Sequence, residues 1–177
     1  MTLDTPRPLD ASAPLSFAAV AEELLDDVYG YLLYLTKNWA VAEDLTSETF
    51  EAAFKTWRRF DPGRGTPRAW LLAIARSTAL DWFRSDARRR KREERSESAE
   101  RRDDSGSFGD GFSAELEEAL RTLSAGEREV VALRIVLDLD GEETARLLGI
   151  SVTAVSTRLS RALSKLEERM RNHDVVA

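Results

Sequence analysis

The sequence predicts an all-α protein, and three observations lead to that class. Apolar residues recur every three or four positions through most of the chain, as they do along one face of an α-helix. Alternation of apolar and polar residues, the pattern of a strand, has no useful length anywhere. A stretch near the carboxyl end has the residue pattern of a helix-turn-helix. Together they predict two small helical domains joined by a flexible linker.

The first domain, over residues 15–95, is expected to contain three helices. The first covers about 16–38. The second covers 39–60, where a segment rich in Pro and Gly ends it, and its packing face is expected to comprise Leu45, Phe50, Ala53, Phe54 and Trp57. The hydroxyl of Thr66 directly before Pro67 marks the start of the third, which continues past residue 83 into a basic stretch. The tryptophans of this domain are expected in its core: Trp39, Trp57, Trp70 and Trp82.

The second domain, over residues 114–172, is expected to hold about four helices. Ser124 with Glu127 has the spacing of a capping box, and Asp140 with Glu143 resembles another. The remaining segments have compositions typical of unfolded chain. We therefore expect a disordered leader, a flexible linker and a tail, at residues 1–14, 96–113 and 173–177.

The turn of the helix-turn-helix lies at Gly149. Ala145 is small where two helices must approach closely, and Ser151 can cap the second helix. At about 100° per residue the second helix presents two rows. One is apolar and is expected to pack: Val155, Leu159, Ala162 and Leu166. The other is small, hydroxylated and cationic: Ala154, Thr157, Arg158, Arg161 and Lys165.

The cationic row has the chemistry of a DNA-reading face. Arg can bond guanine edges or phosphates, and Thr and Ala can contact thymine methyls, so a major groove accepts such a surface. The alternative is an amphipathic surface helix whose charges are simply solvated. The residues around the turn favour the DNA interpretation.

The net charge of −6 would argue against DNA binding, but it is a sum over the whole chain and the charges are unevenly distributed. Residues 61–102 hold 12 basic and 7 acidic residues, and residues 151–177 hold 5 and 3. The segments on either side are acidic. The distribution predicts two separate DNA-facing surfaces on a body whose other faces repel DNA.

The composition also excludes several classes of site. The chain has no cysteine and one histidine, His173, so zinc ribbons, disulfides and histidine-based triads are excluded. Asp138–Gly141 resembles a calcium loop only faintly, and helix capping explains it better. We expect no metal, no cofactor and no enzyme activity. Without a signal peptide or an apolar span of about 20 residues, the chain is expected to be cytoplasmic, with no membrane insertion.

Two sets of motifs resemble a known family. Asp44–Phe50, Ala69–Arg76, Asp81 and Arg84 resemble conserved region 2 of the extracytoplasmic-function (group 4) sigma factors of the sigma-70 family. The stretch Leu123–Leu166 resembles their region 4, above all at Arg128–Val131 and Leu148–Ser151. The match covers nearly everything except the leader and the linker.

The resemblance implies an RNA polymerase sigma factor. Such a protein binds bacterial core RNA polymerase, recognises the minus-10 and minus-35 promoter elements and helps to open the duplex. It implies docking on the polymerase through Asp44, Glu48 and Phe50. The implied minus-10 contacts are Asp61, Gly63, Arg64, Ser77, Asp81, Arg84 and Arg88. The implied minus-35 contacts are Thr153, Ala154, Thr157, Arg158, Arg161 and Lys165.

Within the minus-10 set, the loop from Asp61 to Thr66 matches the loop that captures a base flipped out of the duplex. The chain departs from the family pattern at three positions. Ser77 stands where Asn is common, which removes a bidentate contact to adenine. Ser156 and Ser160 stand where Lys and His are frequent, which leaves Arg158 and Arg161 as the main cationic readers.

Two other functions remain as alternatives. An autonomous helix-turn-helix transcription regulator would bind operators as a dimer, but the chain shows no sensor pocket or heptads. A pure protein-interaction module would leave two cationic faces unexplained. The resemblance further implies control by an anti-sigma factor as partner.

Overall fold

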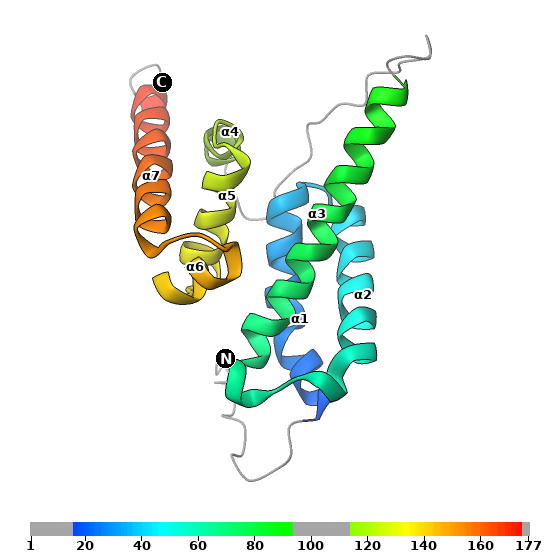
Figure 1. Ribbon diagram of the computed structural model, residues 1–177. Coiled ribbons are helices and arrows are strands. Elements are labelled where there is room, and N and C mark those ends of the chain that lie inside the picture. The colour runs from blue at the N-terminus through cyan, green and yellow to red at the C-terminus, as the bar shows by residue number, and fades with distance from the viewer. Residues whose placement is uncertain (1–15, 94–113, 175–177) are drawn as a thin grey trace, which may run out of the picture.

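The computed structural model describes residues 16–93 and 114–174, and within them every regular element is helical. The expected leader and linker, and the last residues of the tail, lie outside the described residues. The first domain comprises α1 (Phe17–Thr36), α2 (Trp39–Thr56) and α3 (Pro67–Glu93), each of which contacts the other two. The three lie side by side in Figure 1, with α3 extending beyond the others.

The ends of these helices follow from local chemistry. The Ser16 hydroxyl accepts a hydrogen bond from the Ala19 amide at the start of α1, and Asn38 caps α2 through the Val41 amide at 3.1 Å. Lys37, between α1 and α2, has a left-handed backbone (φ 54°) that ends α1. The loop between two long helices is therefore only two residues.

Helix α2 ends at Thr56, four residues before the expected end at Phe60. Residues Trp57–Arg59 tighten into a 3-10 turn, and the Phe60 ring stacks on Trp57 with centroids 5.1 Å apart. The Thr56 hydroxyl bonds back to the Ala52 carbonyl at 2.8 Å. Ring stacking and a tightened last turn therefore override the helical periodicity at this end.

The first domain's core is formed by the inner faces of the three helices. Its fully buried side chains include Val28, Tyr31, Leu32, Leu71 and Leu72. Trp57, Trp70 and Trp82 are half-buried against this core, as expected. Trp39 is not: its side chain is 66% exposed. It occupies the first position of α2, where no described segment covers it.

The second domain comprises α4 (Ala114–Arg121), α5 (Ala125–Val131), a π-helical turn η3 (Ala132–Val136), α6 (Gly141–Leu148) and α7 (Val152–Asp174). Helix α7 contacts α4, α5 and α6. Ser124 and Glu127 form the expected capping box at the start of α5. Asp140 caps α6 by accepting from the Glu143 amide at 2.7 Å.

The turn between α6 and α7 has the geometry that its sequence predicts. Gly149 adopts a left-handed backbone (φ 66°), and the Ile150 amide reaches back to the Ala145 carbonyl at 3.1 Å. The Ser151 hydroxyl caps α7 through the Ala154 amide at 3.1 Å. These bonds form a Schellman-type ending followed by an N-cap, and the helix-turn-helix is confirmed.

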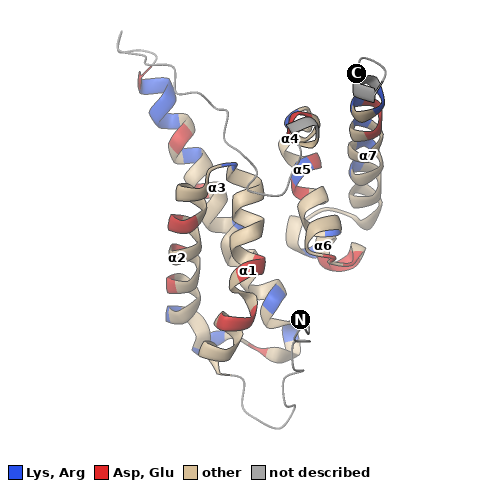
Figure 2. Cartoon of the chain, turned by 180° about the vertical axis from the view of Figure 1, so that it is seen from behind, with Lys and Arg blue, Asp and Glu red and all other residues tan. Residues whose placement is uncertain are grey.

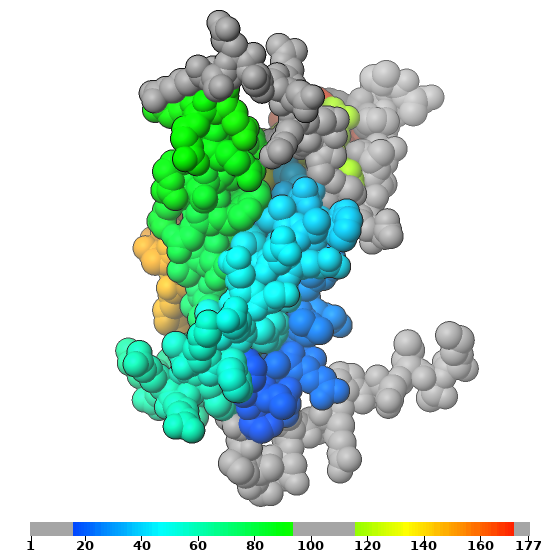
Figure 3. Space-filling model, turned by 90° about the vertical axis from the view of Figure 1, so that its right-hand side faces the viewer, coloured from blue at the N-terminus to red at the C-terminus, as the bar shows by residue number. Residues whose placement is uncertain are grey.

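The two domains pack against each other. Helix α1 contacts α5 and η3, and α3 contacts α6. Figures 1 and 2 show the second domain standing beside α1 and α3, while α2 lies on the far side of the first domain. Figure 3 looks onto that far side, where α2 and α3 form one continuous surface.

Candidate nucleic-acid interface

Helix α3 separates its packing side from an exposed polar row. Leu71, Leu72, Ala75 and Ala79 are buried, whereas the row Ser77, Asp81, Arg84 and Arg88 is exposed along its whole length. Positions three and four apart share a helix face, so these four side chains form one strip. Within it Arg84 donates to Asp81 at 2.8 Å. The carboxylate holds the guanidinium in place and offsets its charge.

Between Arg84 and Arg88, on the other side of the helix, α3 carries a buried acid that sequence reasoning missed. Asp86 is 8% exposed and pairs with Arg89 and, at 2.8 Å, with Arg90. Both arginines come from the next turn of the same helix. Part of the basic stretch is therefore compensated within α3. The spacing of three and four residues was the available signal.

The loop after α2 is shaped by its own side chains. Asp61 accepts a hydrogen bond from the Gly63 amide at 2.9 Å, and Thr66 caps α3 through the Ala69 amide at 3.1 Å. A β-carbon on Gly63 would lie 3.2 Å from the Asp61 carboxylate, so this position favours glycine. Asp61, Gly63 and Arg64 are all exposed.

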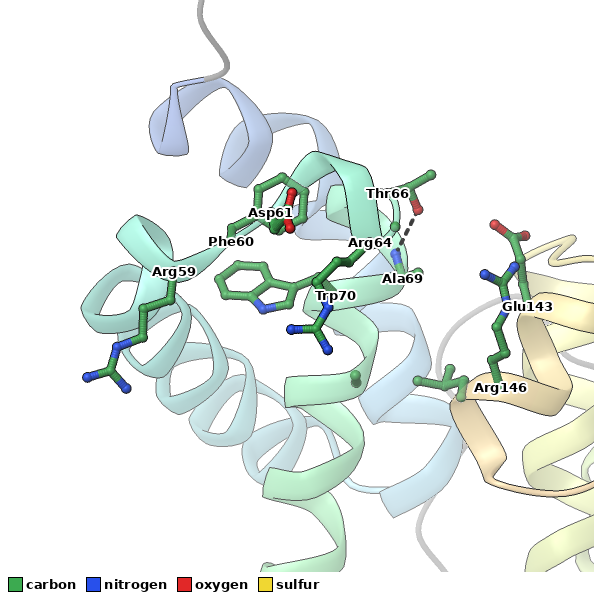
Figure 4. Close-up of a pocket in the computed structure, with 12 residues that line it drawn as sticks. Arg59, Phe60, Asp61, Arg64, Thr66, Ala69, Trp70, Glu143 and Arg146 are labelled. Atoms are coloured by element: carbon green, nitrogen blue, oxygen red, sulfur yellow. Dashed lines mark hydrogen bonds between the residues drawn. The ribbon is translucent and has the colours of Figure 1, made fainter.

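Beside this loop lies a cavity of about 460 Å³. Its first-domain wall includes the aromatic rings of Phe60 and Trp70 together with Arg64. Its other wall comes from α6 and includes Glu143 and Arg146 (Figure 4). Aromatic rings beside a cation can stack a nucleobase and balance a phosphate. The first-domain wall of the cavity carries both kinds of group.

Helix α7 presents the second exposed row. Val155 and Ala162 are buried on its inner side. Of the six expected DNA contacts, four are exposed: Thr153, Thr157, Arg161 and Lys165. Ala154 and Arg158 are half-buried. A β-carbon on Gly126 would come within 3.3 Å of the Arg158 guanidinium, which shows how closely that side chain lies over α5.

Lys165 has a partner inside the protein. Its ammonium donates to the Glu127 carboxylate at 2.8 Å, and Glu127 is 7% exposed. The hydrogen bond from Lys165, together with the backbone amide of Ser124, lowers the pKa of Glu127 from 4.5 to about 2. Lys165 is exposed, as its position in the predicted cationic row requires, but the sequence gave no sign of this partner, because Glu127 lies 38 residues away.

The predicted docking residues on α2 differ in their exposure to solvent. Asp44 and Glu48 are exposed and one helical turn apart, so they share a surface. Phe50 is half-buried, with its ring 6.5 Å from Phe17. The same helix exposes Phe54 at 67%, a residue that the sequence pattern placed on the packing face. Exposed aromatic surface next to acidic residues is typical of a protein-binding site.

Within 16–93 and 114–174, no three His, Cys, Asp or Glu residues gather as a metal ion would need. No helix in those ranges combines the length and apolar character that a bilayer span requires.

Comparison with known proteins identifies both domains. Residues 20–89 match the family model for sigma-70 region 2, and residues 113–166 match the model for sigma-70 region 4. The chain is 34% identical to the RNA polymerase sigma factor CarQ of Myxococcus xanthus, over 80% of this chain and 81% of CarQ. It is 29% identical to the extracytoplasmic-function sigma factor SigX of Bacillus subtilis, over 88% and 84%.

Solved structures give the same result. The sigma factor RpoE of Bartonella quintana, solved in complex with the anti-sigma factor NepR, matches with a TM-score of 0.69 and 26% identity, over 88% of this chain and 96% of RpoE. CnrH, solved with the cytosolic domain of CnrY, matches at 0.64 and 26%, over 88% of each chain. The chain belongs to the extracytoplasmic-function RNA polymerase sigma factors of the sigma-70 family, initiation factors without enzyme activity that direct transcription from specific promoters.

Proposed function

We propose that α3 and α7 read the minus-10 and minus-35 elements respectively, while α2 docks on core RNA polymerase. The observation that carries this proposal is the pair of exposed polar rows on two separate helices. Each row lies opposite a buried apolar row, so each can enter a groove without disturbing its domain core. In this scheme residues 15–95 form the downstream module and residues 114–172 the upstream module.

On α7 the base readers are Arg161, Thr157 and Thr153, with Ala154 beside them. Arg161 is exposed and can reach guanine or phosphate, and the two threonine methyls can contact thymine. Arg158 lies closer to α5 and is suited to a neighbouring phosphate. Lys165 contributes positive charge near the backbone while its bond to Glu127 keeps α7 fixed on α5.

On α3 Ser77 replaces the larger amide that would make a bidentate adenine contact. Arg84, oriented by Asp81, is then the main base or phosphate reader, and Arg88 extends the contact along the backbone. The loop carrying Asp61, Gly63 and Arg64 receives the base that leaves the stack. Its neighbouring aromatic wall offsets part of the unstacking cost, which is a few kcal/mol.

Docking on the polymerase is assigned to the exposed surface of α2. Asp44 and Glu48 supply negative charge, and Phe54 supplies exposed apolar area. Phe50 supports this surface from below through its packing against Phe17. Such a surface fits a partner with basic residues around an apolar groove.

We also propose an anti-sigma factor as a regulatory partner and the cytoplasm as the place of action. Both structural relatives at 26% identity were solved with proteins of that kind or with a cytosolic domain. A partner that covers α2 or the reading rows would compete directly with polymerase and promoter.

Transcription by reconstituted holoenzyme tests the proposal. Core polymerase loaded with this chain should initiate at a limited set of sites on fragmented genomic DNA, and start-site mapping should reveal two separated sequence elements. The free chain should bind the same promoters poorly, because each basic row alone is small. Tight, sequence-specific binding by the free chain at physiological salt would instead indicate an autonomous regulator.

A further inference from the structure

The carboxylate of Glu129 connects the second domain to two helices of the first domain. The Tyr31 hydroxyl on α1 donates to Glu129 Oε1 on α5 at 3.0 Å, and Arg76 Nε on α3 donates to the same oxygen at 2.8 Å. Tyr31 is fully buried, and only 14% of the Glu129 side chain is exposed. Burial, and the nearby Glu129, raise the pKa of Tyr31 well above 10, so the hydroxyl remains a donor. In this arrangement the three polar groups are removed from water and bond one another across the junction.

A second tie lies two turns earlier on α3. Arg68 Nε donates to Asp27 on α1 at 2.6 Å, and its Nη2 donates to the Leu137 carbonyl of the second domain, also at 2.6 Å. Between the two ties, η3 packs on α1 and its Leu133 side chain is fully buried. Arg68 and Arg76 thus hold the second domain along one side of α3. We call this the closed arrangement.

The closed arrangement brings the two reading rows close together. Ser77 follows Arg76, which bonds Glu129, and Glu129 lies two residues from Glu127, the partner of Lys165. Covalent geometry along this path limits the separation of Ser77 and Lys165 to roughly 40 Å. The names minus-10 and minus-35 place the centres of the two promoter elements about 25 base pairs apart. At 3.4 Å per base pair this is about 85 Å along B-DNA. The rows cannot read both elements in this arrangement.

Opening is sterically allowed by the length of the chain. Residues 94–113 connect α3 to α4, and an extended chain of that length can span up to about 70 Å. The closed arrangement also lets Glu143 and Arg146 of α6 line the cavity beside the base-capture loop (Figure 4). Separation of the domains would remove that wall and leave the aromatic side of the cavity open to DNA.

We propose that Glu129 is the centre of an intramolecular latch that holds the free protein in a closed, promoter-incompetent arrangement, and that binding to core polymerase requires the latch to open. The inference rests on the proposed function, because it assigns the two rows to two separated elements. Its physical basis is that Glu129 bonds a buried tyrosine and an arginine at once. Removing the carboxylate leaves both partners unsatisfied in the closed arrangement and so favours the open one.

The test measures the separation of the domains in the free, full-length protein. The chain has no cysteine, so a donor and an acceptor dye can be attached at Ala18→Cys on α1 and Ser164→Cys on α7, both exposed positions. Glu129→Ala removes the carboxylate that accepts both bonds, and Tyr31→Phe removes one donor while keeping the buried ring. Glu168→Ala, which removes an exposed carboxylate on α7, is the control. Far-UV circular dichroism verifies that each variant keeps its helices.

We expect Glu129→Ala to increase the low-transfer, open population at least about tenfold over wild type, with Tyr31→Phe in between and Glu168→Ala unchanged. The affinity of the unlabelled variants for core polymerase should rise by the same factors, because the competent fraction limits the apparent affinity. A folded Glu129→Ala protein with wild-type energy transfer would overturn the latch. So would a variant that opens without any gain in affinity for polymerase.

The latch and the proposed function fail in different ways. Wild-type holoenzyme that initiates from mapped promoters, together with an unchanged distance in Glu129→Ala, refutes the latch and leaves the promoter assignment intact. An increased distance with holoenzyme that initiates at no specific site refutes the promoter assignment. The distance is measured without DNA or polymerase, so the two results are independent.

Discussion

Lys165 on α7 donates a 2.8 Å hydrogen bond to Glu127, the residue that closes the capping box of α5. The bond connects α7, the helix proposed to read the minus-35 element, to the start of α5. Because Glu127 is nearly buried, the pair is screened less than a surface ion pair. The orientation of the exposed row on α7 therefore depends on a contact inside the second domain and not on contact with DNA.

The Glu127 pair predicts acid sensitivity of the second domain. The folded-state pKa of about 2 lies below the ordinary value of 4.5, so the pair contributes stability at pH values above 4.5. That contribution is lost as the pH falls through about 2. Thermal melts of the full chain between pH 7 and pH 2 should show Glu127→Gln with a shallower loss of stability below pH 4.5 than wild type.

The matched control for that experiment is Glu51→Gln. Glu51 also has a lowered pKa, from its hydrogen bond with Lys55, but it is exposed on α2. Solvent screens such a pair, so its removal should leave the pH profile almost unchanged. If stability falls equally steeply with decreasing pH in wild type and in Glu127→Gln, the Glu127–Lys165 pair does not contribute to acid sensitivity.

Replacing the two arginines of α7 should give different results. Arg161→Ala removes an exposed side chain and should leave the unfolding free energy within about 0.5 kcal/mol of wild type. If Arg161 contacts a base, transcription should lose about 1 to 3 kcal/mol of discrimination at one minus-35 position. If it contacts phosphate, all promoters should weaken alike and the salt slope should fall by about one.

Arg158→Ala should affect both stability and transcription, because the side chain lies over Gly126 as well as near the reading row. We expect a measurable drop in melting temperature besides weaker transcription. Holoenzymes assayed on promoters randomised separately at each element would distinguish the two arginines. A shift confined to minus-10 preference in either variant would contradict the assignment of α7 to the upstream element.

Charge reversal on α2 should weaken assembly with polymerase. Asp44→Lys with Glu48→Lys changes two exposed side chains, so the melting temperature should hardly change. Pull-down with core polymerase should nevertheless recover much less of the variant. The control is Glu22→Lys with Glu23→Lys, an equal change of charge on exposed positions of α1. Equal loss in both proteins would mean that net charge, and not the α2 surface, governs the binding.

Ser77→Asn should restore a minus-10 contact. Ser77 is exposed, so a longer side chain meets no core residue, and an amide can bond both N6 and N7 of adenine. Selection of promoters by the variant holoenzyme should enrich adenine at one position by about five- to 160-fold, the range for about 1 to 3 kcal/mol. Ser47→Asn, the same substitution at an exposed position of α2, should select the same sequences as wild type.

Local chemistry explains why so much of the fold was predictable. Ala145, Gly149 and Ser151 each act within a few residues of their own position, and the turn forms as their types require. The two polar rows also follow from helical periodicity alone. Trp39 and Phe54 were placed wrongly because periodicity describes a face of a helix and does not say whether another segment covers it.

Long-range partners account for what the sequence could not supply. Tyr31 and Glu129 are 98 positions apart, and nothing near either residue indicates the other. Arg76 belongs to a matched motif, yet its bond to Glu129 depends on how the domains pack. The same holds for Lys165, because its acidic partner Glu127 lies 38 positions away in the sequence.

Helix α3 runs without a break from Pro67 to Glu93 and carries Arg76 and Ser77 side by side. Neighbouring positions point about 100° apart, so one residue faces the other domain and the next faces outward. An inserted or deleted codon in this stretch would turn every later side chain by that angle and displace both faces at once. Descendants of such a gene can therefore change in length between helices, but within α3 they can diverge only by exchanging one residue for another.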